Sequence, residues 1–231
     1  YFPYNNDDSN GLVIPNSNDF DLGTNDFTIE CWVYITEFPP ADSIIIGIRK
    51  ETNPNNTWWD LKVIYYNNEQ FFEFRAREDN GNSLDLNDRD LNQPNTQTIS
   101  LNTWYHIAIS RTGDNWYFFR NGILGESRIG WSRDIGFSTN YDLMIGGYNY
   151  NDGHANFYKE KRFKGYMDGI KIINGDCAYT TNFDVPNLPF SIVPIHPPMD
   201  KILLTASANN SLILNNNTKL KLGYNNNQYF N

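Results

Sequence analysis

The stretch that decides the fold is Thr103-Trp104-Tyr105-His106-Ile107-Ala108-Ile109, which is followed by Asn115–Arg120 and then by Asn121-Gly122. Apolar side chains occupy both of its alternating faces, and a strand of that kind usually lies in the middle of a layered sheet. Asn-Gly favours a type I′ turn, because both central residues of that turn need a positive φ. The stretch therefore predicts two strands of a β-sandwich closed by a tight turn, and it carries no catalytic chemistry.

The rest of the chain also reads as short strands separated by turns. In Phe27–Ile35 every second side chain is apolar, as in a strand with one buried face. Aromatic residues make up 16% of the chain, which favours strands over helices. We therefore expect an all-β fold, a two-sheet antiparallel β-sandwich. The other expected strands are Ser43–Ile48, Trp59–Tyr66, Phe71–Glu78, Leu143–Ile145 and Phe163–Ile173.

Charge and composition narrow the classes of partner. The net charge of −9 disfavours binding to nucleic acid or to an anionic membrane surface. No run of 18 apolar residues is present, so membrane insertion is not expected. Cys31 lies on the apolar face of a predicted strand, and we expect both it and Cys177 to be free thiols, although spacing alone leaves a disulfide open.

The predicted sandwich covers residues 1–195, and residues 196–231 form a Pro- and Asn-rich extension. Proline cannot pair inside a sheet, so the start of this extension should run along an edge or form a linker. Three short strands are expected further on, at Lys201–Thr205, Ser211–Leu214 and Lys219–Leu222. They either complete the sandwich or begin a further unit.

Several segments resemble the laminin-G-like domains of the concanavalin A-like lectin/glucanase superfamily, which include the pentraxin-like jelly rolls. Phe20–Trp32 is similar to the family opening "LGTGDFTIEAWV", and the blocks follow in family order over roughly residues 10–190. The other similar blocks are Thr103–Ile109, Tyr117–Gly122, Ile145–Gly147 with Phe163–Ile172, and Ala178–Phe183. The last block is commonest in phage and virus structural proteins and in large extracellular proteins.

This resemblance implies a jelly roll that binds glycan or protein, in some members with calcium at the rim. Glucanases of this fold need two carboxylates facing each other across a groove. The nearest candidates here, Glu73 and Glu78, are an odd number of residues apart and so lie on opposite faces. We therefore expect no enzyme activity.

The best binding signal is a set of aromatic, amide and acidic residues in two predicted loops. Sugars stack their C–H faces on aromatic rings, while amides and carboxylates bind the hydroxyls. Loops at one end of a rigid sandwich are where function usually resides. The alternative is that these rings pack beneath their own loops. The expected ligand-binding residues are Trp58, Tyr148, Tyr150, Asn151, Asp152, His154 and Tyr158.

No cofactor is required by the sequence, but calcium fits one segment. Asp79, Asn80, Asn82 and Asp85 supply the oxygen ligands that calcium prefers. They match no EF-hand loop, and we favour a hairpin with Asx turns over a calcium site. His106 is expected to be a hydrogen-bonded core residue, because it lies in a framework strand.

Two functions remain open at this point. The first is a non-catalytic module of a larger surface protein that recognises glycan. The alternative is a purely structural virion component, in a capsid, tail or fibre, that assembles with other subunits through protein–protein contacts. Both predict an extracellular or virion-surface location.

Overall fold

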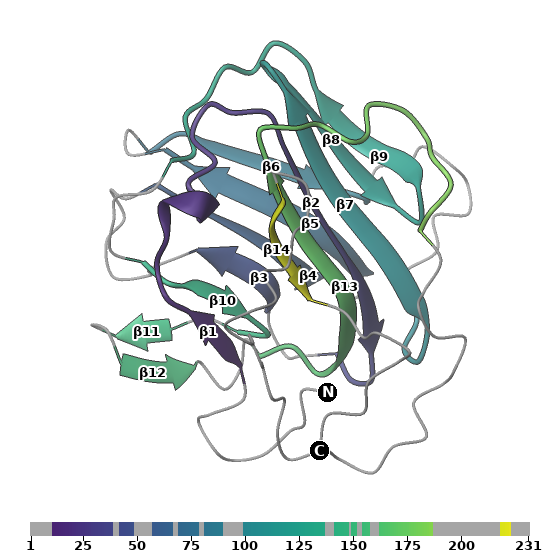
Figure 1. The fold of residues 1–231 in the computed structure, drawn as a ribbon. Helices are drawn as coiled ribbons and strands as arrows, with labels where there is room; N and C mark the ends of the chain where they lie inside the picture. The colour runs from purple at the N-terminus through teal and green to yellow at the C-terminus, as the bar shows by residue number, and fades with distance from the viewer. Residues whose placement is uncertain are drawn as a thin grey trace, which may run out of the picture.

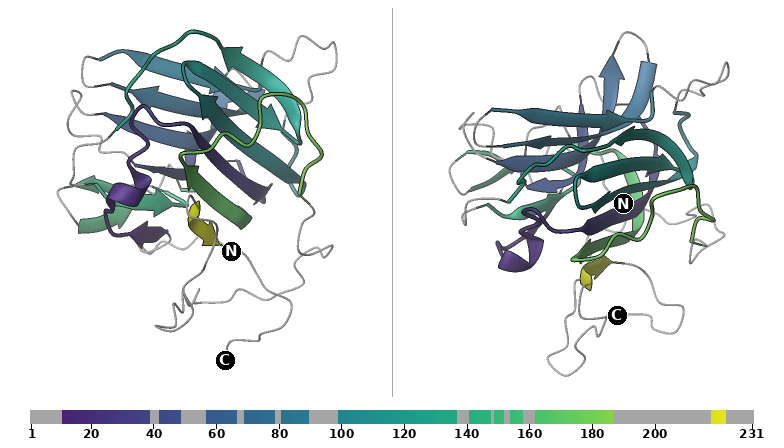
Figure 2. Two further views of the ribbon diagram at one scale, coloured as in Figure 1. Left: turned by 45° about the horizontal axis from the view of Figure 1, so that its top comes forward. Right: turned by 90° about the horizontal axis from the view of Figure 1, so that it is seen from above.

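In the computed structural model the chain forms a sandwich of two antiparallel sheets, each with six strands (Figure 1). This confirms the predicted all-β fold; the described residues also include one short 3₁₀ helix, η1 (Asn18–Phe20). Seen from above, the two sheets lie one over the other (Figure 2). The structure describes residues 11–38, 42–48, 57–66, 69–78, 81–89, 99–136, 141–147, 149–151, 154–157, 162–186 and 218–222.

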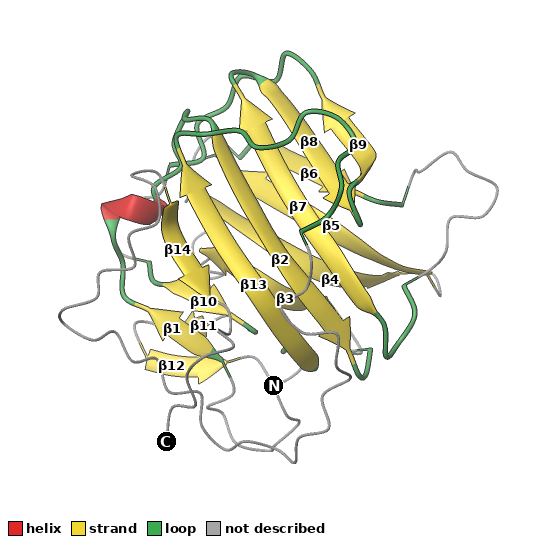
Figure 3. Cartoon of the chain, turned by 45° about the vertical axis from the view of Figure 1, so that its right-hand side comes forward, coloured by secondary structure: helices red, strands yellow, loops and turns green. Residues whose placement is uncertain are grey.

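Sheet A, in front in Figure 3, has β2 and β7 at its centre. Its strands, in spatial order, are β14 (Thr218–Leu222), β13 (Gly165–Asn174), β2 (Phe27–Ile35), β7 (Trp104–Thr112), β8 (Asn115–Arg120) and β9 (Ile123–Arg128). The central place of β7 agrees with its two apolar faces.

Sheet B lies behind sheet A. Its strands, in spatial order, are β1 (Leu12–Ile14), β10 (Leu143–Ile145), β3 (Ser43–Ile48), β4 (Trp58–Tyr66), β5 (Glu69–Arg77) and β6 (Ser83–Asn87). A separate hairpin of β11 (Asn149–Asn151) and β12 (His154–Phe157) lies beside β1 (Figures 1 and 3).

The core lies between the sheets and is rich in aromatic rings. Phe27 and Trp116 come from sheet A, and Trp59 and Phe74 come from sheet B; all four are fully buried. The rings of Phe27 and Trp116 meet edge to face at 5.6 Å, and those of Trp59 and Phe74 stack at 6.2 Å. Each such side chain contributes about 1.5–3 kcal/mol through burial, so this layer holds the sheets together.

The Asn121-Gly122 turn forms as expected, with φ values of 51° and 74°. It closes β8 against β9, a strand that the sequence patterns did not indicate, whereas β7 and β8 join through Gly113 and Asp114. Gly122 also allows a close approach, because a Cβ there would lie 2.0 Å from the carbonyl oxygen of Phe183.

Two further expectations have an outcome. Cys31 and Cys177 are both free, as predicted. The last of the expected C-terminal strands is present as β14, which pairs with β13 and so extends sheet A; the other two lie outside the described residues. No helix in the described part of the chain is both long and apolar enough to cross a bilayer.

Candidate functional site

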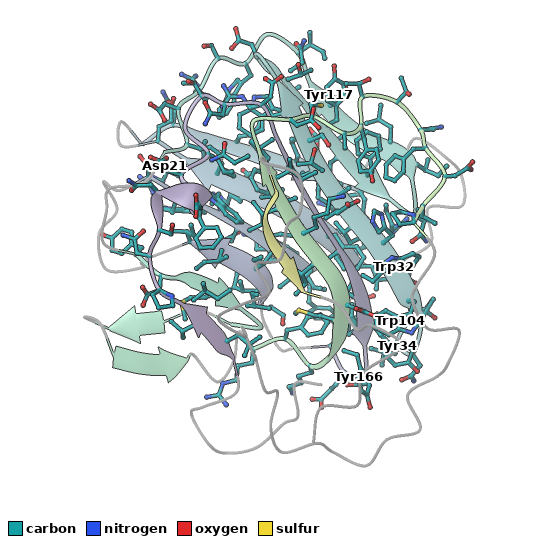
Figure 4. The ribbon with its side chains drawn as sticks, viewed as in Figure 1. Asp21, Trp32, Tyr34, Trp104, Tyr117 and Tyr166 are labelled. Atoms are coloured by element: carbon teal, nitrogen blue, oxygen red, sulfur yellow. The ribbon has the colours of Figure 1, made fainter. Side chains whose placement is uncertain are left out.

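Four partly exposed aromatic residues gather on the outer face of sheet A, at one end of β2, β7 and β13 (Figure 4). We call Trp32, Tyr34, Trp104 and Tyr166 the aromatic patch. Tyr34 is the central member, since it lies opposite Trp104 on one neighbouring strand and opposite Tyr166 on the other. Its ring centroid is 5.4 Å from that of Trp104 and 5.7 Å from that of Tyr166.

The alternation of β2 and β7 explains why these rings face outward. The inner face of β2 carries apolar side chains that are buried in the core, namely Phe27, Ile29, Cys31, Val33 and Ile35. The intervening residues Trp32 and Tyr34 must therefore point away from it. In β7 the side chain of Tyr105 packs in the core, so that of Trp104 points outward.

The spacing of the patch depends on a close approach of two backbones. Gly165 begins β13 opposite Ile35 of β2. A Cβ at Gly165 would lie 1.9 Å from the carbonyl oxygen of Tyr34. Glycine is therefore required there for β13 to pair with β2 beside Tyr166.

A second row of side chains lies one step along the same strands. Trp32 stands between His106 on β7 and Asp168 on β13. The His106 ring meets Trp32 edge to face, with the centroids 5.2 Å apart. Asp168 accepts a hydrogen bond from the backbone N–H of Gly169, at 2.7 Å. This row thus adds a partly exposed carboxylate to the aromatic surface.

A third row forms a polar cluster around Glu30. Its carboxylate lies 3.3 Å from Nε2 of His106, accepts a hydrogen bond from the hydroxyl of Tyr179 at 2.8 Å, and pairs with Lys171. Burial acts to raise the pKa of Glu30, but these three partners outweigh it and lower the pKa to about 2. Glu30 is therefore a charged anchor, and His106 is the buried, hydrogen-bonded residue that the sequence predicted.

The segment after β13, residues 175–186, crosses the other half of this face; we call it the strap (Figure 1). Its two rings, Tyr179 and Phe183, stack on each other with centroids 3.6 Å apart. Phe183 covers Phe119 at 5.3 Å and reaches His106 at 5.8 Å. The backbone N–H of Phe183 donates to the carbonyl oxygen of Gly122 at 2.9 Å. The rings of the strap thus cover the outer face of sheet A up to His106. The aromatic patch begins beside that residue, at Trp32.

The basic side chains described next to the patch have acidic partners. The basic side chains on the outer face of β2, β7 and β13 are His106 and Lys171, and both contact Glu30. Lys164, just before β13, pairs with Glu37. The patch itself presents aromatic rings and hydroxyls, so it can stack against a ligand and exchange hydrogen bonds with it.

One predicted ligand-binding residue is in the wrong environment. Trp58 was expected at a loop edge, but it is the first residue of β4 and only 5% of it is exposed. The strand begins one residue earlier than the pattern indicated, so the side chain of Trp58 lies on the outer face of sheet B. The guanidinium carbon of Arg75 lies over the Trp58 ring, 5.9 Å from the ring centroid. A ring covered in this way offers little stacking surface.

The other predicted ligand-binding residues stay predictions. Tyr150 and Asn151 lie in β11 and His154 lies in β12, where Asn151 pairs with His154 across the hairpin. Tyr148, Asp152 and Tyr158 lie outside the described residues.

The candidate calcium site, which the sequence analysis ranked below a hairpin with Asx turns, also stays untested. Asp79 and Asn80 lie outside the described residues. The amide of Asn82 donates to Glu78 at 3.4 Å, and Asp85 pairs with Arg75 at 2.8 Å. The described residues bring together no group of three His, Cys, Asp or Glu side chains that could hold a metal.

Glu73 and Glu78, the nearest candidates for the two catalytic carboxylates of a glucanase, each pair with a different basic residue. Glu73 pairs with the buried Lys62 at 3.0 Å, and burial raises the pKa of Glu73. Glu78 follows the end of β5 and pairs with Arg133 at 3.3 Å. These two ion pairs support the fold and do not resemble an acid and a nucleophile placed around a substrate.

The comparisons with known proteins agree with this architecture. The family model described as the concanavalin A-like lectin/glucanases superfamily matches residues 6–177. No curated protein sequence matches the chain.

Solved structures of other proteins have a similar fold. The binding domain of Paraclostridial Mosquitocidal Protein 1 is 15% identical, with a TM-score of 0.52; the match covers 75% of this chain and 39% of that chain. The sialidase CBM40 of Ruminococcus gnavus, solved with α2,3 sialyllactose, is 12% identical, with a TM-score of 0.51; the match covers 73% of this chain and 91% of that chain. At these identities the likeness concerns the fold.

Proposed function

Because the chain belongs to the concanavalin A-like lectin/glucanases superfamily, we propose that it is a non-catalytic module that binds glycan through the aromatic patch. The observation that carries this proposal is the row of three partly exposed rings, Trp104, Tyr34 and Tyr166, in register on adjacent strands. Aromatic rings with polar tips suit a ligand that has both apolar faces and hydroxyls.

The rigidity of the site supports this role. The rings stand on three paired strands and not on loops, so little conformational entropy is lost when a ligand binds. The sequence-predicted loop residues around β11 and β12 would form a separate contact region. The module would belong to a larger protein outside the cell or on a virion, as the resemblance of Ala178–Phe183 implies.

The test is a glycan array with the whole chain and two variants. Trp32→Ala removes one ring of the patch and should abolish or strongly reduce the signals. Tyr117→Ala is the matched control, since Tyr117 is an aromatic residue of β8 at the opposite end of the same sheet (Figure 4). Equal signals from Trp32→Ala and the unaltered chain would exclude the patch as the site. Absence of glycan binding together with self-association would favour the alternative structural role.

A further inference from the structure

We infer that the indole N–H of Trp32 donates a hydrogen bond to the ligand, and that Gly169 keeps this edge of the indole uncovered. Trp32 is then a binding residue that contributes more than its ring, and Gly169 is a positioning residue. The inference rests on the proposed glycan binding. It adds the chemical group that the site recognises, a hydrogen-bond acceptor next to an apolar face.

The indole N–H of Trp32 is open to a ligand. Within the part of the chain that the structure describes, no group accepts a hydrogen bond from it. Its nitrogen is not one of the buried polar atoms that lack a partner, as Nε1 of Trp59 is, so water reaches it. Nε1 of Trp116, in contrast, donates to the carbonyl oxygen of Trp131 at 3.0 Å.

Neighbours on both sides determine how the Trp32 ring lies. On the β7 side the ring of His106 meets it edge to face, at 5.2 Å and 66°. His106 is 1% exposed and its Nε2 lies 3.3 Å from the carboxylate of Glu30, so its ring is held in place. On the β13 side a Cβ at Gly169 would lie 3.4 Å from Cδ1 of Trp32. Because Cδ1 is bonded to Nε1, the N–H edge of the indole faces β13.

A β-bulge in β13 leaves this edge without a covering side chain. The register of β13 with β2 shifts between Asp168 and Lys171, where two residues of β13 stand opposite one residue of β2. The first of the two, Gly169, has a φ of 57°, which glycine adopts without a steric penalty. The second, Ile170, packs in the core. A longer side chain at position 169 would crowd the N–H edge of Trp32, whereas glycine leaves room there for a ligand atom.

The chemistry of the indole determines what this atom must be. An indole N–H donates and cannot accept, so the ligand group opposite it is an acceptor. A ligand that covers Trp32 displaces the water at the N–H and has to replace its hydrogen bond. The oxygens of a sugar can do so while the C–H face of the same sugar lies on the ring. A purely apolar ligand cannot.

Native gel electrophoresis with mixed-linkage β-glucan, galactomannan or arabinoxylan in the gel tests the binding role on the whole chain. We expect at least one of them to slow the unaltered chain. In that gel Trp32→Phe keeps a ring, loses the N–H and should bind on the order of threefold more weakly, as for one hydrogen bond. Gly169→Asn should weaken binding similarly, and asparagine tolerates a positive φ. Gly113→Asn is the matched control and should bind normally, since Gly113 has a positive φ and nothing within 4 Å of its Cβ position.

NMR of the indole N–H groups tests the geometry without a ligand. The signal of Trp32 is identified by its loss in Trp32→Phe. Its proton should exchange rapidly with water in the free chain, and that of Trp116 should exchange slowly. Exchange at Trp32 should become slower in Gly169→Asn and stay the same in Gly113→Asn. An oligosaccharide of the retarding polysaccharide should move the Trp32 signal downfield.

Several results would overturn the inference and leave glycan binding intact. A Trp32 proton as protected as that of Trp116 would show that the N–H is not open. Unchanged affinity of Trp32→Phe would remove the hydrogen bond, and unchanged affinity of Gly169→Asn would remove the role of Gly169. No retardation in any of the gels would instead remove the proposed function, and this inference with it. Circular dichroism spectra that match the unaltered chain establish that each variant is folded.

Discussion

The two halves of the outer face of sheet A differ in what lies over their aromatic residues. In one half the strap covers Phe119, which is fully buried, and ties down the polar cluster around Glu30. In the other half Tyr34 and its neighbours stay partly exposed. The same strands thus contribute to folding in one half and carry the proposed binding surface in the other.

The largest expected difference in stability is between truncation of a ring beneath the strap and truncation of a ring in the aromatic patch. Phe119→Ala should lower the free energy of unfolding by about 3–5 kcal/mol, because it opens a cavity beneath Tyr179 and Phe183. Tyr34→Ala should cost about 1 kcal/mol, the value of one aromatic contact at a partly exposed site. Urea unfolding of both variants measures the difference. An equal cost would mean that the patch is part of the core.

The next effect is a dependence on pH through Glu30. Its pKa is 4.5 when unperturbed and about 2 in the folded chain. Between pH 2 and pH 4.5 the folded state therefore binds fewer protons than the unfolded state. The stabilisation is therefore complete above pH 4.5 and is lost as the pH falls toward 2. Its size is on the order of 3 kcal/mol.

Urea unfolding over a pH series measures this loss, and Glu30→Gln should abolish it. Glu37→Gln removes the same charge from an exposed position and is the control. Equal pH dependence of Glu30→Gln and the unaltered chain would contradict the anchoring role of Glu30.

A pair of glycines tests whether the strap must lie close to the β8–β9 turn. Gly113 and Gly122 both have a positive φ, but a Cβ at Gly113 would meet nothing within 4 Å. Gly113→Ala should therefore cost only the backbone strain, about 1 kcal/mol. Gly122→Ala should cost a further 1–3 kcal/mol, since its methyl group collides with the strap. Thermal unfolding compares the stabilities of the two variants. Similar losses of stability would mean that the strap can move away from the turn at little cost.

The smallest effect concerns one hydroxyl group. Tyr179→Phe removes the hydrogen bond to Glu30 and keeps the ring, so it should cost about 1 kcal/mol. Tyr117→Phe alters a tyrosine of the same sheet outside the strap and should stay within about 0.5 kcal/mol of the unaltered chain. Chemical unfolding at neutral pH checks both. A neutral Tyr179→Phe would leave the stacked rings as the main attachment of the strap.

Most of the fold could be predicted from the sequence, because local patterns determine it. Phe27–Ile35, Ser43–Ile48 and Asn115–Arg120 have the expected bounds as β2, β3 and β8. The alternation of apolar and polar residues indicates where such strands lie. Asn121 and Gly122 both have the positive φ that a type I′ turn requires. β9 was missed, since its Ile123–Arg128 sequence carries no regular apolar alternation.

The aromatic patch could not be predicted in the same way. Alternation alone places Trp32 and Tyr34 on the outer face of β2, which is a usable signal. Their neighbours depend on the register of β2 with β7 and β13, which are distant in sequence. Trp58 was predicted to lie at a loop edge because the start of β4 was placed one residue too late. In the structure it is the first residue of the strand, and its side chain lies on a covered face of the sheet.

Gly165 has a consequence that reaches beyond its own strand. Its missing side chain lets β13 approach Tyr34 of β2, so the spacing between the rings of Tyr34 and Tyr166 depends on a residue that has no side chain of its own. A substitution there would part the strands at this end while keeping every ring. The selectivity of the proposed site for ligands of different breadth would therefore change while every ring of the aromatic patch is kept.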